Sequence, residues 1–145
     1  MSEKNEAVVR HMLEEVWNQR NLNAIEKFFT SDYINNDPVN PTNGLEAYRK
    51  IVEKYVSAFP DCRIDIDELC SAGDQVIVRW RYSGTHRGPL EGLAPTGRYA
   101  TGTGISISRV QGEKIREAFV NWDALGLMQQ LGAVTLPGKV AAAGA

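Results

Sequence analysis

The sequence is poor in the side chains that most often bind metal ions or form covalent cross-links. It contains two cysteines, Cys62 and Cys70, and two histidines, His11 and His86. Eight residues of extended chain span roughly 26 Å, whereas a disulfide needs Cα atoms within about 7 Å. We therefore predict free thiols and a reducing, cytoplasmic setting. Because the histidines and cysteines form no cluster, we expect no metal site.

The sequence also lacks long apolar runs and an excess of either charge. No run approaches 18 apolar residues, and the N-terminal MSEKNEAVVRHM has no apolar segment, so we expect neither a membrane span nor a signal peptide. Sixteen lysines and arginines stand against eighteen aspartates and glutamates, a net charge of −2. Without a basic patch, nucleic acid is not an expected partner.

The chain is nevertheless long and apolar enough for one globular domain. It has 145 residues, of which 43% are hydrophobic and 23% charged. These values are typical of a folded domain with its own core. We expect that domain to occupy residues 1–134. The C-terminal segment 135–145, rich in small residues, is expected to be a poorly ordered tail.

Hydrophobic periodicity changes along the chain, from helical spacing to alternation. The first part predicts helices at 3–19, at 23–29 with a weak Asn23/Glu26 capping box, and at 44–59 before Pro60. The second part predicts strands at 63–69, 75–85, 99–110 and 114–122, then a short helix ending near Gly132. The segment between the second and third helices, SDYINNDPVNPTNG, is expected to be turns. Helices followed by adjacent strands indicate an α+β fold with an antiparallel sheet.

Details of the strands indicate how the sheet is shaped. Gly102 and Gly104 lie inside a predicted strand and suggest a bend or bulge in it, as a curved sheet needs. Alternation in 75–85 places Val76, Val78, Trp80 and Tyr82 on one face. Apolar residues on both faces predict a homodimer joined through the open face of the sheet.

Four segments, in order, resemble the SnoaL-like polyketide cyclases of the nuclear transport factor 2-like superfamily. They are VWNQRNLNAIEKFFTSDYINNDP, AFPDCRIDIDEL, GDQVIVRWRYSGTHRGPLEGLAPTGR and NWDALGLMQQLG. The resemblance implies a cone-shaped fold, with a strongly bent sheet and N-terminal helices around one deep pocket, and frequent homodimers. For the cyclases it implies an intramolecular aldol ring closure without metal or other cofactor. This chain has Asn36 and Ala118-Phe119 where many relatives carry His and His-Trp.

Asp123 is the candidate acid/base, because the resemblance places the carboxylate of the family there. An aldol closure removes an acidic C–H proton and returns a proton to the acceptor carbonyl, which one carboxylate can do in sequence. The alternative is structural. Asp123 directly precedes a predicted helix, and aspartate is a preferred N-cap residue. Both roles can hold together.

The other candidate site residues also have structural alternatives. His86 could assist Asp123 or only hydrogen-bond the backbone of its loop. Asn36 and Tyr33 are expected near the pocket mouth, whereas the neighbouring Asp37 is expected to serve turn geometry. Further candidate contacts to substrate are Arg98, Trp17 and Phe119, although aromatic residues such as the last two are more often core residues than ligand contacts.

The sequence leaves three functional classes open. The first is a cofactor-free cyclase or isomerase that transfers protons in an apolar pocket around a hydrophobic small molecule. The second is a related pocket enzyme such as an epoxide hydrolase, for which Asp65 and Asp67 are conceivable carboxylates. The third is a binding module for a hydrophobic ligand without catalysis.

Overall fold

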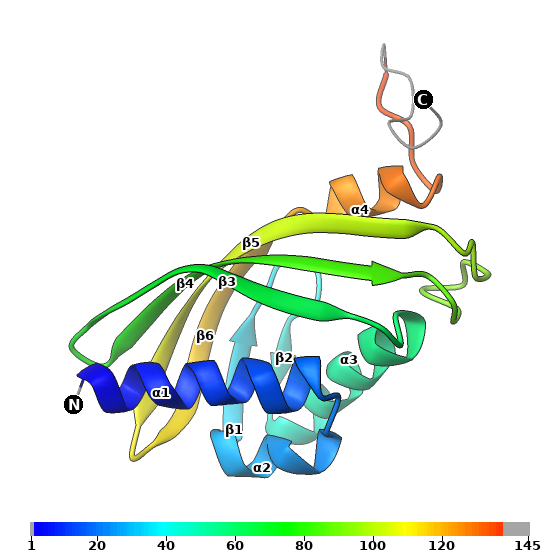
Figure 1. The fold of residues 1–145 in the computed structure, drawn as a ribbon. Coiled ribbons are helices and arrows are strands. Elements are labelled where there is room, and N and C mark those ends of the chain that lie inside the picture. Colours follow the sequence, from blue (N-terminus) through cyan, green and yellow to red (C-terminus); the bar gives the residue numbers. More distant parts are fainter. Residues whose placement is uncertain (1, 138–145) are drawn as a thin grey trace.

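The computed structural model describes residues 2–137, with four α-helices beside one curved sheet of six strands (Figure 1). The helical elements are α1 (Ser2–Met12), a π-helix continuing it (Leu13–Asn18), a 3₁₀ turn (Leu22–Ala24), α2 (Ile25–Phe28), α3 (Leu45–Ala58) and α4 (Ala124–Gln130). The strands are β1 (Phe29–Asn36), β2 (Thr42–Asn43), β3 (Arg63–Ala72), β4 (Gln75–Thr85), β5 (Tyr99–Gln111) and β6 (Lys114–Trp122). The predicted α+β class is confirmed. Residues 138–145 of the predicted tail lie outside the described part.

The sheet has the strand order β2-β1-β6-β5-β4-β3. Neighbouring strands pair antiparallel, except that β1 runs parallel to β6.

Within residues 2–137, no helix has the length and apolar character of a membrane span.

Strand β1 corrects the expectation that the chain after α2 forms only turns. Tyr33, Asn35 and Asn36, expected in a loop, lie on this strand. The sequence FTSDYINN has few alternating apolar residues and therefore gives little indication of a strand. The strand forms because β6, far along the chain, supplies its hydrogen-bond partners and a buried environment for Tyr33 and Asn35.

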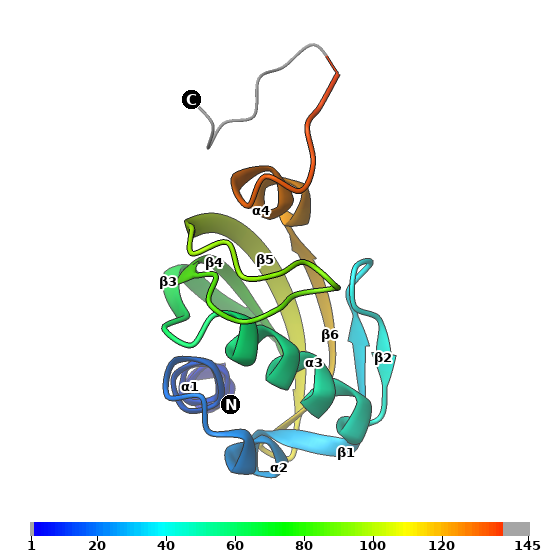
Figure 2. The ribbon, with the colours of Figure 1, turned by 90° about the vertical axis from the view of Figure 1, so that its right-hand side faces the viewer.

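Helices α1 and α3 cover the concave face of the sheet. Figure 2 shows α1 and α3 in front of the strands, with α2 below and α4 beyond the far end. Buried residues of α1 and α3, including Val9, Met12 and Val52, pack with Val76 and Val78 in the main core. A second cluster joins the end of α3 to α4 and to the loop after β4; its buried members are Ala58, Phe59, Leu90, Ala100, Leu127 and Leu131.

The glycines of β5 create space rather than a bulge. Pairing between β4 and β5 continues without a break from Gln75↔Arg109 to Thr85↔Tyr99, so the predicted irregularity at Gly102 and Gly104 is absent from this pair. A Cβ atom at either glycine would overlap the ring of Tyr82 or Trp80. Irregular pairing occurs instead at Ile66/Glu68 and at Arg109/Val110. The glycines therefore let two aromatic rings lie flat on the concave face.

One helix start differs from the prediction, whereas both ends of α4 agree with it. The cap before the second helical segment is Asn21 rather than Asn23, because the Asn21 side chain accepts a hydrogen bond from the Asn23 N–H. At the start of α4, Asp123 accepts a hydrogen bond from the Gly126 N–H at 2.8 Å, as predicted for an N-cap. Gly132 has a φ of 81°, as expected after the end of this helix.

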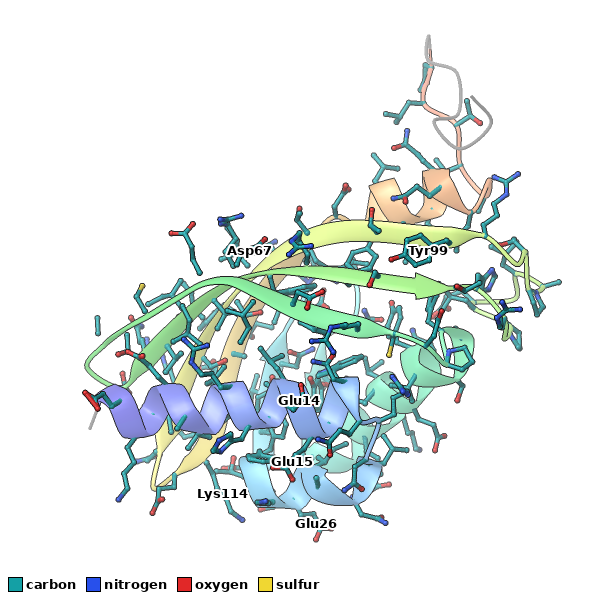
Figure 3. The ribbon with its side chains drawn as sticks, viewed as in Figure 1. Glu14, Glu15, Glu26, Asp67, Tyr99 and Lys114 are labelled. Carbon is teal, nitrogen blue, oxygen red and sulfur yellow. The ribbon has the colours of Figure 1, made fainter. Side chains whose placement is uncertain are left out.

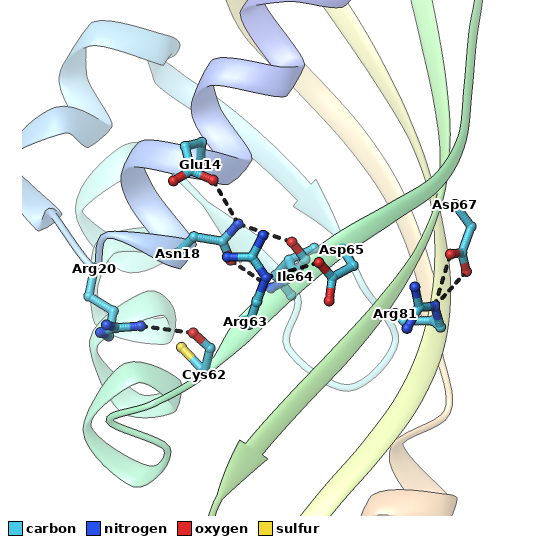
Figure 4. Close-up of polar contacts among 9 residues, drawn as sticks. All are labelled: Glu14, Asn18, Arg20, Cys62, Arg63, Ile64, Asp65, Asp67 and Arg81. Atoms are coloured by element: carbon cyan, nitrogen blue, oxygen red, sulfur yellow. Dashed lines mark hydrogen bonds and ion pairs between the residues drawn. The ribbon is translucent and has the colours of Figure 1, made fainter.

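Side chains of the π-helix and of the residues after it form hydrogen bonds with the unpaired edge of β3. The Asn18 amide donates to the Ile64 C=O at 3.0 Å and accepts from the Ile64 N–H at 2.6 Å (Figure 4). Arg20, with a positive φ of 55°, donates to the Cys62 C=O at 2.8 Å. The side chains after α1 thus take the place of a neighbouring strand at this point.

The convex face of the sheet carries ion pairs between β3 and β4, and beside them apolar residues. Asp67 on β3 lies on the side away from α1 and binds Arg81 with its carboxylate at 2.9 Å (Figures 3 and 4). Closer to the β2 edge of the sheet, three apolar residues occupy adjacent positions across β4, β5 and β6: Ile77, Ile107 and Phe119. Apolar area therefore remains uncovered in the single chain.

Candidate functional site

A cavity of about 160 Å³ lies between the concave face of the sheet and the helices. Most of its lining is aromatic or aliphatic, as is usual for a small-molecule site. The aromatic lining comes from helices and sheet alike: Trp17, Phe29, Tyr33, Tyr48, Tyr55, Phe59, Trp80, Tyr82 and Trp122. The site is therefore suited to an apolar ligand held by a few polar contacts.

Asp37, one residue beyond β1, is the one carboxylate among the described residues that line the cavity. It is 6% exposed. One carboxylate oxygen accepts from the Val39 N–H at 2.9 Å, and the other accepts from Trp122 Nε1 at 3.1 Å and from Asn40 Nδ2 at 3.5 Å. A carboxylate has about four acceptor positions, so these three donors leave room for one contact to a ligand.

Asp37 belongs to a polar cluster that connects the cavity to the surface. Asn40 Nδ2 also donates to the Tyr55 hydroxyl at 3.0 Å, and Lys54 Nζ donates to Asn40 Oδ1 at 3.1 Å. Lys54 in turn pairs with Glu91 in the loop after β4. These contacts fix Asn40, and Asn40 helps to fix the carboxylate.

Aromatic rings hold Trp122 in place beside Asp37. The indole makes edge-on contacts with Tyr55 at 5.8 Å and with Tyr82 at 5.9 Å between ring centroids. Burial raises the pKa of both tyrosines. They are therefore neutral near pH 7 and can donate a hydrogen bond without contributing charge.

A second aromatic group in the cavity lining consists of Phe29, Tyr33 and Tyr48. Tyr33 packs edge-on against Phe29 at 4.6 Å and Tyr48 at 4.9 Å. The Tyr33 hydroxyl donates to Asn35 Oδ1 at 3.0 Å, and burial raises the pKa of Tyr33 well above its usual value. The half-buried Cys62 also lines the cavity, and burial raises the pKa of its thiol.

The floor of the cavity includes two serines of β5. Ser106 accepts a hydrogen bond from Trp80 Nε1 at 2.9 Å. Ser108, two residues further on the same face, lies beside Val76 and Ala118 on the adjacent strands. These are small, uncharged groups in otherwise apolar surroundings.

Of the five predicted ligand contacts, two line the cavity and three, including Arg98, do not. Tyr33 and Trp17 are lining residues. Asn36 points elsewhere and donates to Glu117 Oε2 and to the Ala118 C=O, both at 3.1 Å. Phe119 is 44% exposed on the convex face, because alternation along β6 turns it away from the inward-facing Ala118.

The predicted catalytic pair lies outside the residues that line the cavity. Asp123 is exposed and caps α4. His86 is fully buried and accepts a hydrogen bond at Nδ1 from the Thr96 N–H at 3.1 Å, the backbone role considered for it. Arg98 is exposed and donates to the Gln130 C=O at 3.1 Å. Their proposed roles in function remain predictions.

Asp37 is the residue whose position sequence reasoning missed. Its predicted turn role is present, because it accepts from the Val39 N–H two residues ahead. The same side chain also reaches Trp122, which lies 85 residues later in the chain. The available indication was its position next to Asn36, in the segment expected near the pocket mouth.

The described residues contain no group of three or more His, Cys, Asp or Glu side chains arranged to hold a metal ion. What the cavity offers is one carboxylate, several neutral hydroxyls and an aromatic wall. Such a set can accept and return a proton at carbon and can orient carbonyl groups.

Comparison with known proteins agrees with this geometry. Residues 7–131 match the family model described as SnoaL-like polyketide cyclase. A candidate polyketide cyclase from Acidithiobacillus ferrooxidans is 28% identical, with 91% of this chain and 96% of that chain covered and a TM-score of 0.81. No curated protein sequence gave a significant match.

Two further solved structures share the fold at lower identity. A candidate SnoaL-like polyketide cyclase from Jannaschia sp. CCS1 is 19% identical over 92% of this chain and 95% of that chain, with a TM-score of 0.84. AclR, a candidate hydroxylase from Streptomyces galilaeus, is 23% identical over 95% of this chain and 87% of that chain, with a TM-score of 0.83. The fold therefore occurs in proteins given different activities.

Proposed function

The chain belongs to the SnoaL-like polyketide cyclase family, and on this basis we propose that it is a cofactor-free acid/base enzyme, a cyclase or isomerase of a carbonyl-containing small molecule. The observation that carries the proposal is the Asp37 carboxylate, buried in an apolar and aromatic cavity with one acceptor position free. We assign proton transfer to Asp37 rather than to the exposed Asp123.

The chemistry needs no group beyond the side chains of the cavity. Asp37 removes a proton from a carbon flanked by carbonyl groups, which leaves an enolate on the ligand. In a cyclisation the enolate carbon attacks a second carbonyl of the same molecule, and the resulting alkoxide takes the proton back from Asp37. In an isomerisation the proton returns to another carbon. Exclusion of water strengthens the electrostatic interactions that stabilise the enolate.

The geometry around Asp37 suits this role. One carboxylate oxygen accepts hydrogen bonds from Trp122 at the end of β6 and from Asn40 in the loop after β1. The other oxygen accepts from the Val39 N–H. A carboxylate held in this way needs little reorganisation when a ligand binds. The neutral Tyr55 hydroxyl lies in the same cluster, where it accepts from Asn40 Nδ2 and makes a long hydrogen bond of 3.4 Å to Asn40 Oδ1 that a ligand acceptor can replace.

Hydrogen exchange at carbon tests the proposal without knowledge of the natural substrate. The bicyclic ketone 2-tetralone has acidic protons next to its carbonyl, and deuterium uptake from D₂O can be followed by NMR. We expect the protein to accelerate this exchange above the buffer rate. Tetralin, which has no carbonyl, should inhibit by competition. Absence of any acceleration, with 2-tetralone shown to bind, would contradict the proposal.

One observation favours a second candidate function, a binding module without catalysis. Three N–H groups already donate to Asp37, so its main task could be to hold Val39, Asn40 and Trp122 in place. A module of this kind would bind 2-tetralone and tetralin without accelerating exchange. The same experiment therefore separates the two functions.

A further inference from the structure

The concave side of β5 is almost entirely occupied by other side chains. Five small residues face inward along it: Ala100, Gly102, Gly104, Ser106 and Ser108. The Tyr82 and Trp80 rings cover the two glycines, and the Trp80 indole also donates to the Ser106 hydroxyl. Of the two serines, Ser106 therefore has its oxygen held by Trp80, whereas no side-chain hydrogen bond within residues 2–137 engages Ser108.

Ser108 is enclosed by protein but faces the cavity. It is 4% exposed and is one of the lining residues. Within residues 2–137, its hydroxyl has no hydrogen-bond partner. The hydroxyls of Thr30 and Thr42 are also unpaired, but they are sealed inside the protein, whereas Ser108 borders open space. An unpaired hydroxyl in apolar surroundings is costly unless water or a ligand completes its hydrogen bonding, so a ligand that displaces the water must supply an acceptor.

The neighbours of Ser108 determine which ligand group fits. Val76 on β4 and Ala118 on β6 are its partners across the strands, and both are apolar. Asn35, next in the same row, has its amide oxygen bound to Tyr33 and its amide nitrogen bound to the Asn40 C=O. A serine hydroxyl is uncharged and can donate one hydrogen bond. A neutral oxygen acceptor suits this place better than an ion.

We infer that Ser108 is a carbonyl-recognition residue, whose hydroxyl donates to a ketone oxygen of the ligand at the end of the cavity away from Asp37. The inference rests on the proposed function only in placing the ligand in this cavity. Ser108 and Asp37 are separated by roughly two strand spacings and two residues along a strand, about 12 Å between Cα positions on a flat sheet. A rigid ligand of two or three fused rings, with a carbonyl at one end, spans the space between the two side chains.

A pair of probes that differ by one carbonyl tests this assignment. 1-Tetralone and tetralin share a bicyclic skeleton, and only 1-tetralone has a ketone oxygen. Dissociation constants of both probes are measured by calorimetry for the wild type and for Ser108→Ala. We expect the Kd ratio of 1-tetralone to tetralin to rise roughly 2- to 12-fold in Ser108→Ala, the range for one neutral hydrogen bond. Tetralin affinity itself should stay unchanged.

Ser106→Ala is the matched control, because it removes a hydroxyl from the same face of the same strand. The Ser106 oxygen accepts from Trp80 Nε1, so loss of this hydroxyl frees the indole, which should affect both probes alike and leave the Kd ratio unchanged. An unchanged ratio in Ser108→Ala, an equal change in Ser106→Ala, or failure of both probes to bind the wild type would overturn the inference. Equilibrium binding needs no turnover, so an inactive Asp37 would not alter this result.

Discussion

Replacement of Asp37 by asparagine should separate proton transfer from ligand binding. In the wild type one carboxylate oxygen accepts from Val39, and the other accepts from Trp122 and Asn40. Asparagine has nearly the same size but only one acceptor oxygen. Its NH₂ group must therefore face N–H donors on one side. Asp37→Asn removes the titratable group and weakens at least one of these hydrogen bonds.

The structure gives a magnitude for both effects. A buried donor left without its acceptor costs about 1–3 kcal/mol. For a chain of this length, that loss should lower Tm by roughly 3–10 °C. If Asp37 transfers the proton, the rate of hydrogen exchange into 2-tetralone should fall about 10²–10⁴-fold, the usual contribution of a positioned general base. Tetralin should still bind, because the aromatic wall is unchanged.

Asp123→Asn is the matched comparison, since it makes the same chemical change at an exposed helix cap. Asparagine caps helices about as well as aspartate, so stability should stay near that of the wild type. Exchange activity should also remain, because Asp123 is not a lining residue of the cavity. If Asp123→Asn loses activity and Asp37→Asn retains it, our assignment is refuted and the family-based prediction for Asp123 is supported.

Four other substitutions and measurements follow from the same structure. Asp123→Ala removes the cap of α4 and should cost about 0.5–2 kcal/mol in thermal denaturation, without an effect on probe binding. Gly104→Ala should destabilise by roughly 1–3 kcal/mol and weaken tetralin binding, because its methyl group would overlap the indole above it. Burial raises the pKa of the Cys62 thiol, so at pH 8 it should react with Ellman's reagent more slowly than exposed Cys70, and bound tetralin should slow it further. We propose that the convex face forms a homodimer: light scattering should give twice 16.1 kDa, and Phe119→Lys should shift the mass toward the monomer.

The elements that the sequence predicted best are those with a regular pattern and clear ends. The apolar stripe of α3 and the Pro60 that follows it predicted that helix within a residue at either end. The bounds of β4 and β6 agree with the predicted 75–85 and 114–122, because each alternating segment begins directly after a tight turn. These elements are specified locally.

What the sequence did not predict depends on distant partners. Strand β1 exists because it pairs with β6, about 80 residues away, and its own pattern is mostly polar. The contact of Asp37 with the cavity likewise depends on Trp122. Asn36 was predicted to face a ligand, but its pairing opposite Phe119 places both residues outside the cavity lining. Which side of a strand a residue occupies became clear only once the pairing register was known.

The side chains that follow α1 have a consequence for how this protein behaves in concentrated solution. An edge strand with free N–H and C=O groups is a template onto which another molecule's strand can add, a common first step of aggregation. At the β3 edge, Asn18 occupies both backbone groups of Ile64, and Arg20 occupies the Cys62 carbonyl. Asn18→Ala would leave the N–H and C=O groups of Ile64 free, and Arg20→Ala would leave the Cys62 C=O free. Turbidity on gentle heating should then appear at lower protein concentration, even where the folded monomer is little altered.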